Sequence, residues 1–155
     1  MSNTSVKGKE VILKKPPMVI FGMFSDLSML VAGLPDEYKA KVQADKDSIR
    51  IEYKGISMGI KVERREPFSL VVLKDDGQSF ISFTMSFFMD PVGLDSSLFH
   101  IELEAELNFM MKMMVGNKLQ EMVDSITDQI ENAVNSAAAG QPVDFSDIKP
   151  PVSFS

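Results

Sequence analysis

The side chains able to do chemistry are few, and they lie apart from one another in the sequence. His100 is the only histidine and there is no cysteine, so a catalytic triad would need this one ring and a thiolate nucleophile is excluded. Glu102, Glu104 and Glu106 alternate along the chain as the solvent-facing side of a strand does. The sequence has no glycine-rich phosphate loop and no HExxH motif. It therefore predicts no catalytic residue, no metal site and no cofactor.

The segment NFMMKMMVG, residues 108–116, concentrates methionine around one lysine, Lys112. Asn108 is a good N-cap, so we expect a helix to begin here. Projected at ~100° per residue, Lys112 falls on the apolar side of that helix. A buried ammonium group without a partner is costly. Two alternatives therefore remain for Lys112: it faces the anionic end of an apolar ligand, or it extends into solvent.

Met110 and Met114 fall on the side of the helix that holds polar residues further along, and Met113 borders that side. They either pack beneath short helices near the amino terminus or form an exposed portal or subunit contact. A homodimer through these three residues is one predicted outcome.

Composition limits the classes of partner. With 155 residues the chain is expected to form one domain, and its net charge of -6 repels nucleic acid and anionic lipid surfaces alike. The first residues, MSNTSVKGKE, contain no apolar signal core, and no apolar run approaches the ~20 residues of a membrane span. We therefore expect a cytoplasmic protein with no nucleic-acid partner and no integral membrane association.

The elements that must position these side chains follow from the hydrophobic pattern. A strand centred on residues 11–13 is followed by two short helices, at 18–26 and 28–34. Period-two alternation then predicts strands at 48–53, 56–63, 69–73, 80–89 and 99–107, with a tight turn at Asp76-Gly77. A single helix is expected from Phe109 to about Ala138, with a continuous apolar stripe. Short turns between consecutive strands indicate an antiparallel meander whose dry face is covered by this helix.

This order of elements, with Asp26-Leu27-Ser28 and Leu34-Pro35 after the first helix, resembles the helix-grip superfamily abbreviated SRPBCC. That superfamily includes START lipid-transfer domains, birch pollen allergens and polyketide cyclases. The similar segments are VKGKEVILKKPPMVIFGMFSDLSML, IKVERREPFSLVVL and LEAELNFMMKMMVGNKLQEMVDSITDQI, and with the strands between them they cover Ser5 to Ala138. The resemblance implies a pocket for an apolar molecule between sheet and final helix, and it carries over no catalytic residue.

We therefore expect an α+β helix-grip fold, in which a curved antiparallel sheet of about six to seven strands wraps around the final helix. The domain should span residues 1–138, and residues 139–155 should form an extended or mobile extension. The preferred function is binding or transport of a small hydrophobic ligand. The residues expected to contact it are Phe83, Phe87, Phe99, Ile101, Leu103, Met111, Lys112 and Val115.

Two other functions remain open. A cyclase-like or hydrolase-like enzyme could use the same pocket, with Lys112 or Tyr53 moving a proton. An interaction module could use the methionine-rich start of the last helix.

Overall fold

The computed structural model of the protein describes residues 2–32, 36–53, 55–77, 81–115 and 118–137, together with Gln141 and Val143. The helices are α1 (Pro17–Ser25), α2 (Leu27–Ala32), α3 (Asp36–Lys39), α4 (Phe109–Val115) and α5 (Leu119–Ser136). The strands are β1 (Ser2–Lys7), β2 (Val11–Leu13), β3 (Val42–Ala44), β4 (Ser48–Tyr53), β5 (Ile56–Glu66), β6 (Leu70–Asp75), β7 (Ser82–Val92) and β8 (Ser96–Leu107).

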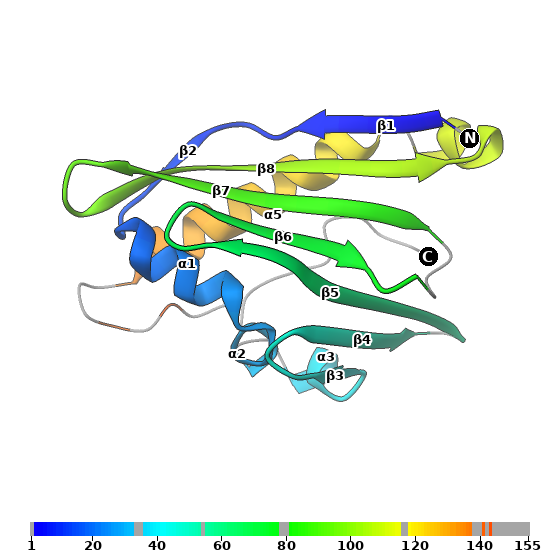
Figure 1. Ribbon diagram of the computed structural model, residues 1–155, viewed down its shortest axis with the longest axis horizontal. Helices are drawn as coiled ribbons and strands as arrows, with labels where there is room; N and C mark the ends of the chain where they lie inside the picture. Colours follow the sequence, from blue (N-terminus) through cyan, green and yellow to red (C-terminus); the bar gives the residue numbers. More distant parts are fainter. Residues whose placement is uncertain are drawn as a thin grey trace.

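In the described part of the chain these strands form one antiparallel sheet, in the order β1-β8-β7-β6-β5-β4-β3, with β2 also paired to β8 (Figure 1). Strands β4 to β8 form the predicted meander, β3 extends it at one edge, and β1 and β2 add the amino-terminal edge. α5 packs against β1, β2 and β8, whereas α1 packs against β6, β7 and β8. The fold is therefore the predicted α+β arrangement of a curved sheet around a long carboxy-terminal helix.

The clearest alternation in the sequence produces the centre of the sheet. On β8, all five residues of the predicted inward face are buried: Phe99, Ile101, Leu103, Ala105 and Leu107. Across the β7–β8 ladder, Phe99 pairs with Met89, Ile101 with Phe87, Leu103 with Met85 and Ala105 with Phe83. Residues directly opposite in an antiparallel pair share a face, so this alternation sets the inward face of both strands.

The expected single helix from Phe109 to Ala138 is wrong. The structure has two helices, α4 and α5, and Lys118 lies between them in a 3-10 conformation. Gly116 and Asn117, at the point of separation in the sequence, lie outside the described residues.

α5 is fixed along the free edge of β1 and β2 by its own side chains. The Asn135 amide accepts a hydrogen bond from the Lys14 N–H (2.8 Å) and donates one to the Ile12 carbonyl (3.1 Å). In the same way, Asp124 accepts from the Lys9 N–H, and Gln120 donates to the Lys7 carbonyl, both at 3.0 Å. These bonds satisfy edge groups that would otherwise lack partners.

Other differences from the expected fold are local. The amino-terminal segment forms two strands instead of one, and α3 and β3 were not expected, so the sheet has eight strands instead of six to seven. Gly77 has a φ of 84°, which glycine adopts without strain. The tight turn expected at Asp76-Gly77 is not confirmed, because Lys74 pairs with Thr84, and residues 78–80 between the two strands lie outside the described residues. The proposed boundary at residue 138 stays a prediction, although Val143 beyond it packs against the core.

Candidate functional site

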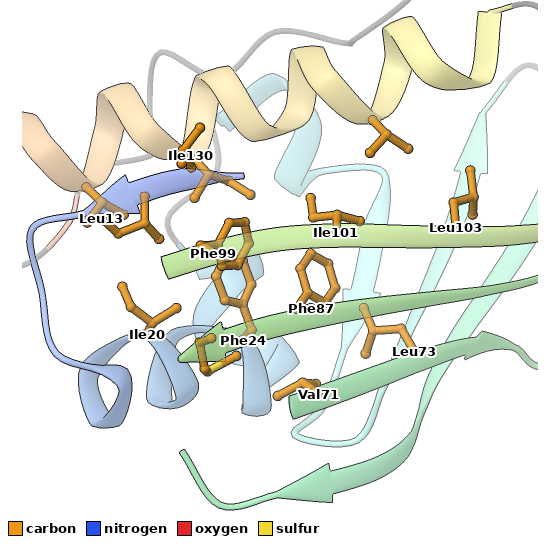
Figure 2. Packing of buried hydrophobic residues seen from close by; sticks show 14 of the residues in the cluster. Leu13, Ile20, Phe24, Val71, Leu73, Phe87, Phe99, Ile101, Leu103 and Ile130 are labelled. Carbon is orange, nitrogen blue, oxygen red and sulfur yellow. The ribbon is translucent and has the colours of Figure 1, made fainter. Parts of the chain in front are cut away.

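One end of the concave face is filled by a phenylalanine from α1. The Phe24 ring stacks on Phe87 at 4.8 Å and on Phe99 at 5.7 Å between centroids (Figure 2). All three side chains are buried. The sequence did not identify Phe24 as part of this cluster, because the pairing of a short helix with two distant strands leaves no local signal.

The other end of the same face is apolar but only half-buried. Ile49 pairs with Ile60 across β4 and β5, and Met85 and Phe83 lie on the inward face of β7. We call these four side chains the apolar floor: Ile49, Ile60, Phe83 and Met85. Each packs against the core yet keeps part of its surface exposed.

α5 turns an apolar flank toward this floor. Val123, Ile130 and Val134 are the buried centre of the helix. At ~100° per residue, the edge-binding residues Asp124 and Asn135 lie to one side of that centre. Three half-buried apolar residues lie on the other side: Leu119, Met122 and Ile126. Because the first flank bonds to the β1–β2 edge, the second lies on the side of α5 away from that edge, and like the floor it packs against the core cluster.

Five of the residues predicted to line a cavity lie together. Phe87, Phe99, Ile101 and Leu103 belong to one core cluster, and Phe83 of the floor packs against it. Met111 is half-buried on α4 and Lys112 is exposed there. The side chain of Val115 lies outside the described residues. Binding by any of these residues stays a prediction.

A hollow of about 330 Å³ adjoins the floor, and its size is within the usual range of ligand pockets. It is lined by Gln43, Ala44, Asp45, Ser48, Ile49, Arg50, Ile60 and Asp76. Arg50 forms an ion pair with Asp76 and donates to the Ser57 hydroxyl at 2.8 Å. The Asp76 carboxylate lies over Gly59, where any Cβ atom would overlap it. A glycine is therefore required at residue 59 for this pair to form.

Asp75 is a buried carboxylate beside the floor, and it is already engaged. It accepts hydrogen bonds from the N–H groups of Phe83 (2.9 Å) and Gly77 (3.0 Å) and from the Ser82 hydroxyl (3.3 Å). Burial acts to raise the pKa of Asp75, but these hydrogen bonds outweigh it and hold the pKa below its usual value of 3.8. Asp75 therefore stays ionised and fixes the end of β6 to the start of β7.

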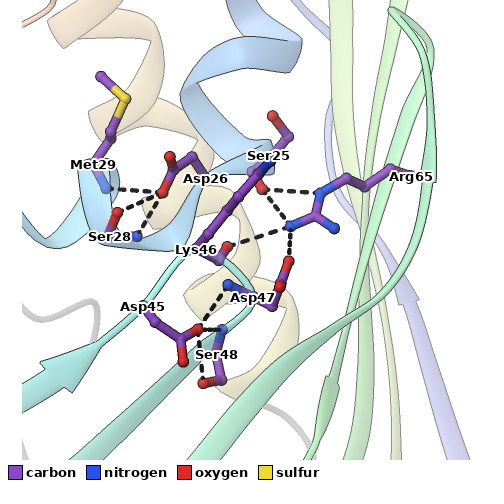
Figure 3. Close-up of polar contacts among 9 residues, drawn as sticks. All are labelled: Ser25, Asp26, Ser28, Met29, Asp45, Lys46, Asp47, Ser48 and Arg65. Carbon is purple, nitrogen blue, oxygen red and sulfur yellow. Dashed lines mark hydrogen bonds and ion pairs between the residues drawn. The ribbon is translucent and has the colours of Figure 1, made fainter.

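Arg65 connects three segments at the α1 end of the sheet (Figure 3). Its guanidinium donates to the Ser25 carbonyl at 2.7 and 3.0 Å, to the Lys46 carbonyl at 3.3 Å and to the Asp47 carboxylate at 2.6 Å. The neighbouring Arg64, by contrast, pairs with the Glu66 carboxylate in solvent.

The reason for this difference is a break in strand register. The pairing of β5 with β6 shifts between Val62 and Arg64, so the alternation of faces changes within β5. Arg65 then pairs with the buried Val71 and faces the helices. Nothing in the sequence marks this bulge.

The remaining candidates for chemistry lie on the convex face. His100 stacks on Phe88 at 4.7 Å, and its Nε2 lies 2.7 Å from the Glu102 carboxylate. Among the described residues, no three acidic or histidine side chains gather as ligands for a metal ion. None of the described helices is both long and apolar enough to span a membrane.

No protein-family model matches the sequence, and no curated protein is recognisably similar to it. Solved structures nevertheless share its fold. A norcoclaurine synthase mutant from Thalictrum flavum, in complex with a transition-state analogue, is 12% identical with a TM-score of 0.66, over 86% of this chain and 94% of the synthase.

Two further structures agree in fold. The Aha1 dimer from Colwellia psychrerythraea is 14% identical with a TM-score of 0.59, over 88% of this chain and 98% of that one. A START superfamily protein from Mycobacterium smegmatis is 17% identical with a TM-score of 0.55, over 85% and 96%. The helix-grip fold implied by the sequence resemblance is thus confirmed.

Proposed function

We propose that the protein binds a small, largely apolar molecule between the apolar floor and α5. The observation that supports this most is an asymmetry of the concave face. Phe24 fills the α1 end, whereas Ile60, Phe83 and Met85 at the other end are only half-buried. Apolar side chains that face inward and are incompletely covered are the usual wall of a ligand site.

The chemistry of this wall limits the ligand. The floor and the facing flank of α5 consist of aliphatic, thioether and phenyl groups. Asp75, the buried carboxylate beside them, has its oxygens occupied by donors from its own turn. Met85 and Met122 lie on opposite sides and adapt to irregular shapes because their side chains are unbranched. The preferred ligand is therefore apolar over most of its surface and forms few hydrogen bonds with the protein.

The fold supports this proposal by analogy only. One structural neighbour, the norcoclaurine synthase mutant, holds a small molecule, a transition-state analogue. Another belongs to the START superfamily. Neither is similar enough in sequence to transfer a ligand, so the proposal depends on the floor itself.

The absence of tryptophan from the chain allows a sharp test. A Phe83→Trp variant places one indole on the floor, and a matched Phe88→Trp variant places one on the convex face, where Phe88 is also half-buried. Titration with N-phenyl-1-naphthylamine should quench the indole of the first variant through energy transfer and quench the second far less. Equal quenching in both variants, or saturable binding in neither, would refute the proposal.

Catalysis in the same site stays a prediction. Lys112 is exposed on α4, and the side chain of Tyr53 lies outside the described residues. A homodimer through Met110, Met113 and Met114 and a cytoplasmic location also stay predictions. The structure places these three methionines at the surface, so packing beneath the amino-terminal helices is wrong.

A further inference from the structure

α4 turns its apolar face outward. Phe109, Met110, Met113 and Met114 are 81%, 69%, 71% and 68% exposed, and we call these four side chains the α4 patch. At ~100° per residue they occupy one continuous arc of about 140°, and Met111 lies on the opposite, half-buried side. An ordinary surface helix is apolar toward the protein and polar toward water, so α4 is inverted.

Residues 107–120, which include the patch, differ in charge from the whole protein. The chain carries a net charge of -6, yet these residues contain two lysines and no aspartate or glutamate, and the exposed Glu106 and Glu121 flank them. Lys112 lies beside Phe109 at one edge of the apolar arc, and Lys118 is the first described residue after α4. Both lysines are exposed. An apolar arc with a basic rim combines burial of apolar side chains with attraction for anionic groups.

We propose that the α4 patch inserts into the surface of an anionic lipid membrane. The four apolar side chains would enter the boundary between headgroups and acyl chains, and Lys112 and Lys118 would extend to the phosphate groups. A second copy of the chain fits less well, because a symmetric contact brings the lysine rims of two copies together. The acidic residues elsewhere do not prevent docking, because charges beyond a Debye length of ~10 Å are largely screened in salt.

The position of α4 makes this contact relevant to the floor. α4 begins at Phe109, directly after β8, and Ala105 near the end of β8 pairs with Phe83 of the floor. Docking by α4 would therefore place this end of the concave face near the lipid. The membrane contact itself does not depend on the proposed ligand binding, and each can fail without the other.

The test is sedimentation of the full-length protein with vesicles of phosphatidylcholine alone or mixed with phosphatidylglycerol. A Met113→Glu/Met114→Glu variant disrupts the patch, and a Met18→Glu/Met29→Glu variant changes two methionines that are 60% and 67% exposed on other helices. We expect the patch variant to bind mixed vesicles at least tenfold more weakly, and the control to stay within about twofold of the wild type. Lys112→Gln should cost about fivefold on mixed vesicles and little on phosphatidylcholine.

Three outcomes would overturn the proposal. The first is a wild-type protein that does not bind mixed vesicles. The second is an equal loss in the patch and control variants while circular dichroism shows both to be folded. The third is a wild-type dimer in sedimentation equilibrium that the patch variant converts to a monomer, with no vesicle binding, which would assign the patch to a second copy.

Discussion

Replacing Phe24 with alanine tests whether this ring closes the α1 end of the concave face. Phe24 is 3% exposed and stacks on Phe87 and Phe99 with interplanar angles of 8° and 22°. Truncating a buried phenylalanine to alanine removes its transfer free energy and leaves a cavity, at about 3–5 kcal/mol. That is a large part of the ~5–15 kcal/mol by which domains of this kind are stable.

The assay is urea unfolding followed by far-ultraviolet circular dichroism, read as a lower midpoint with an unchanged slope. Phe68→Ala is the matched control, because Phe68 is 50% exposed and, among the described residues, contacts one ring, Phe21, edge-on at 5.7 Å. We expect the control to lose about 1 kcal/mol or less.

The Phe24→Ala variant also has a binding readout. If the ring separates the packed end of the face from the floor, its removal should extend the apolar space and strengthen binding of N-phenyl-1-naphthylamine. A stability loss no larger than that of Phe68→Ala would refute the packing argument. A full stability loss with no change in probe binding would show that Phe24 does not border the site.

Three further substitutions test individual contacts. Gly59→Ala should lower the free energy of unfolding by about 1–3 kcal/mol, because the added Cβ overlaps the Asp76 carboxylate. Gly22→Ala, on the exposed side of α1 with no atom near the added Cβ, should raise it by up to about 1 kcal/mol, and denaturant midpoints measure both changes. Asn135→Leu should lower the free energy of unfolding by about 1–3 kcal/mol and speed amide hydrogen exchange at the edge of β2, because it removes two hydrogen bonds to that edge. Unchanged exchange would show that the Asn135 amide does not protect this edge. Asp75→Asn should cost a similar amount at neutral pH. The pKa of Asp75 is lower in the folded than in the unfolded protein, so its ionised form stabilises the fold above the unfolded pKa, and this stabilisation is lost as the pH falls through the folded pKa. The difference in unfolding free energy between Asp75→Asn and the wild type should therefore shrink below pH 3.8. A difference that stays constant across that range would contradict the assignment.

Much of the sheet could be predicted because period-two alternation states which side chains face inward. Phe99, Ile101 and Leu103 are buried as expected. The helix α5 could also be predicted, because its buried residues Val123, Ile130 and Val134 recur at helical spacing. These patterns are local in the sequence, and they predict the structure because each strand or helix buries one of its sides.

The site was harder to predict because it depends on which elements meet. Phe24 fills the space between two strands more than sixty residues away, and only the three-dimensional fold brings them together. Arg65 faces inward because of a bulge in β5, which shifts the alternation without a sequence signal. The prediction of one final helix was wrong because the apolar pattern continues across the point where α4 ends and α5 begins.

Methionine methyl resonances offer the most direct test of the proposed ligand site. In protein labelled with carbon-13 at the methionine methyl groups, Met85 reports on the floor and Met122 on the facing flank of α5. Met18 and Met29, both exposed on other helices, are internal controls. With N-phenyl-1-naphthylamine added, the account predicts saturable shifts at Met85 and Met122 and none at Met18 and Met29. Shifts confined to the exposed methionines, or none at all, would contradict it.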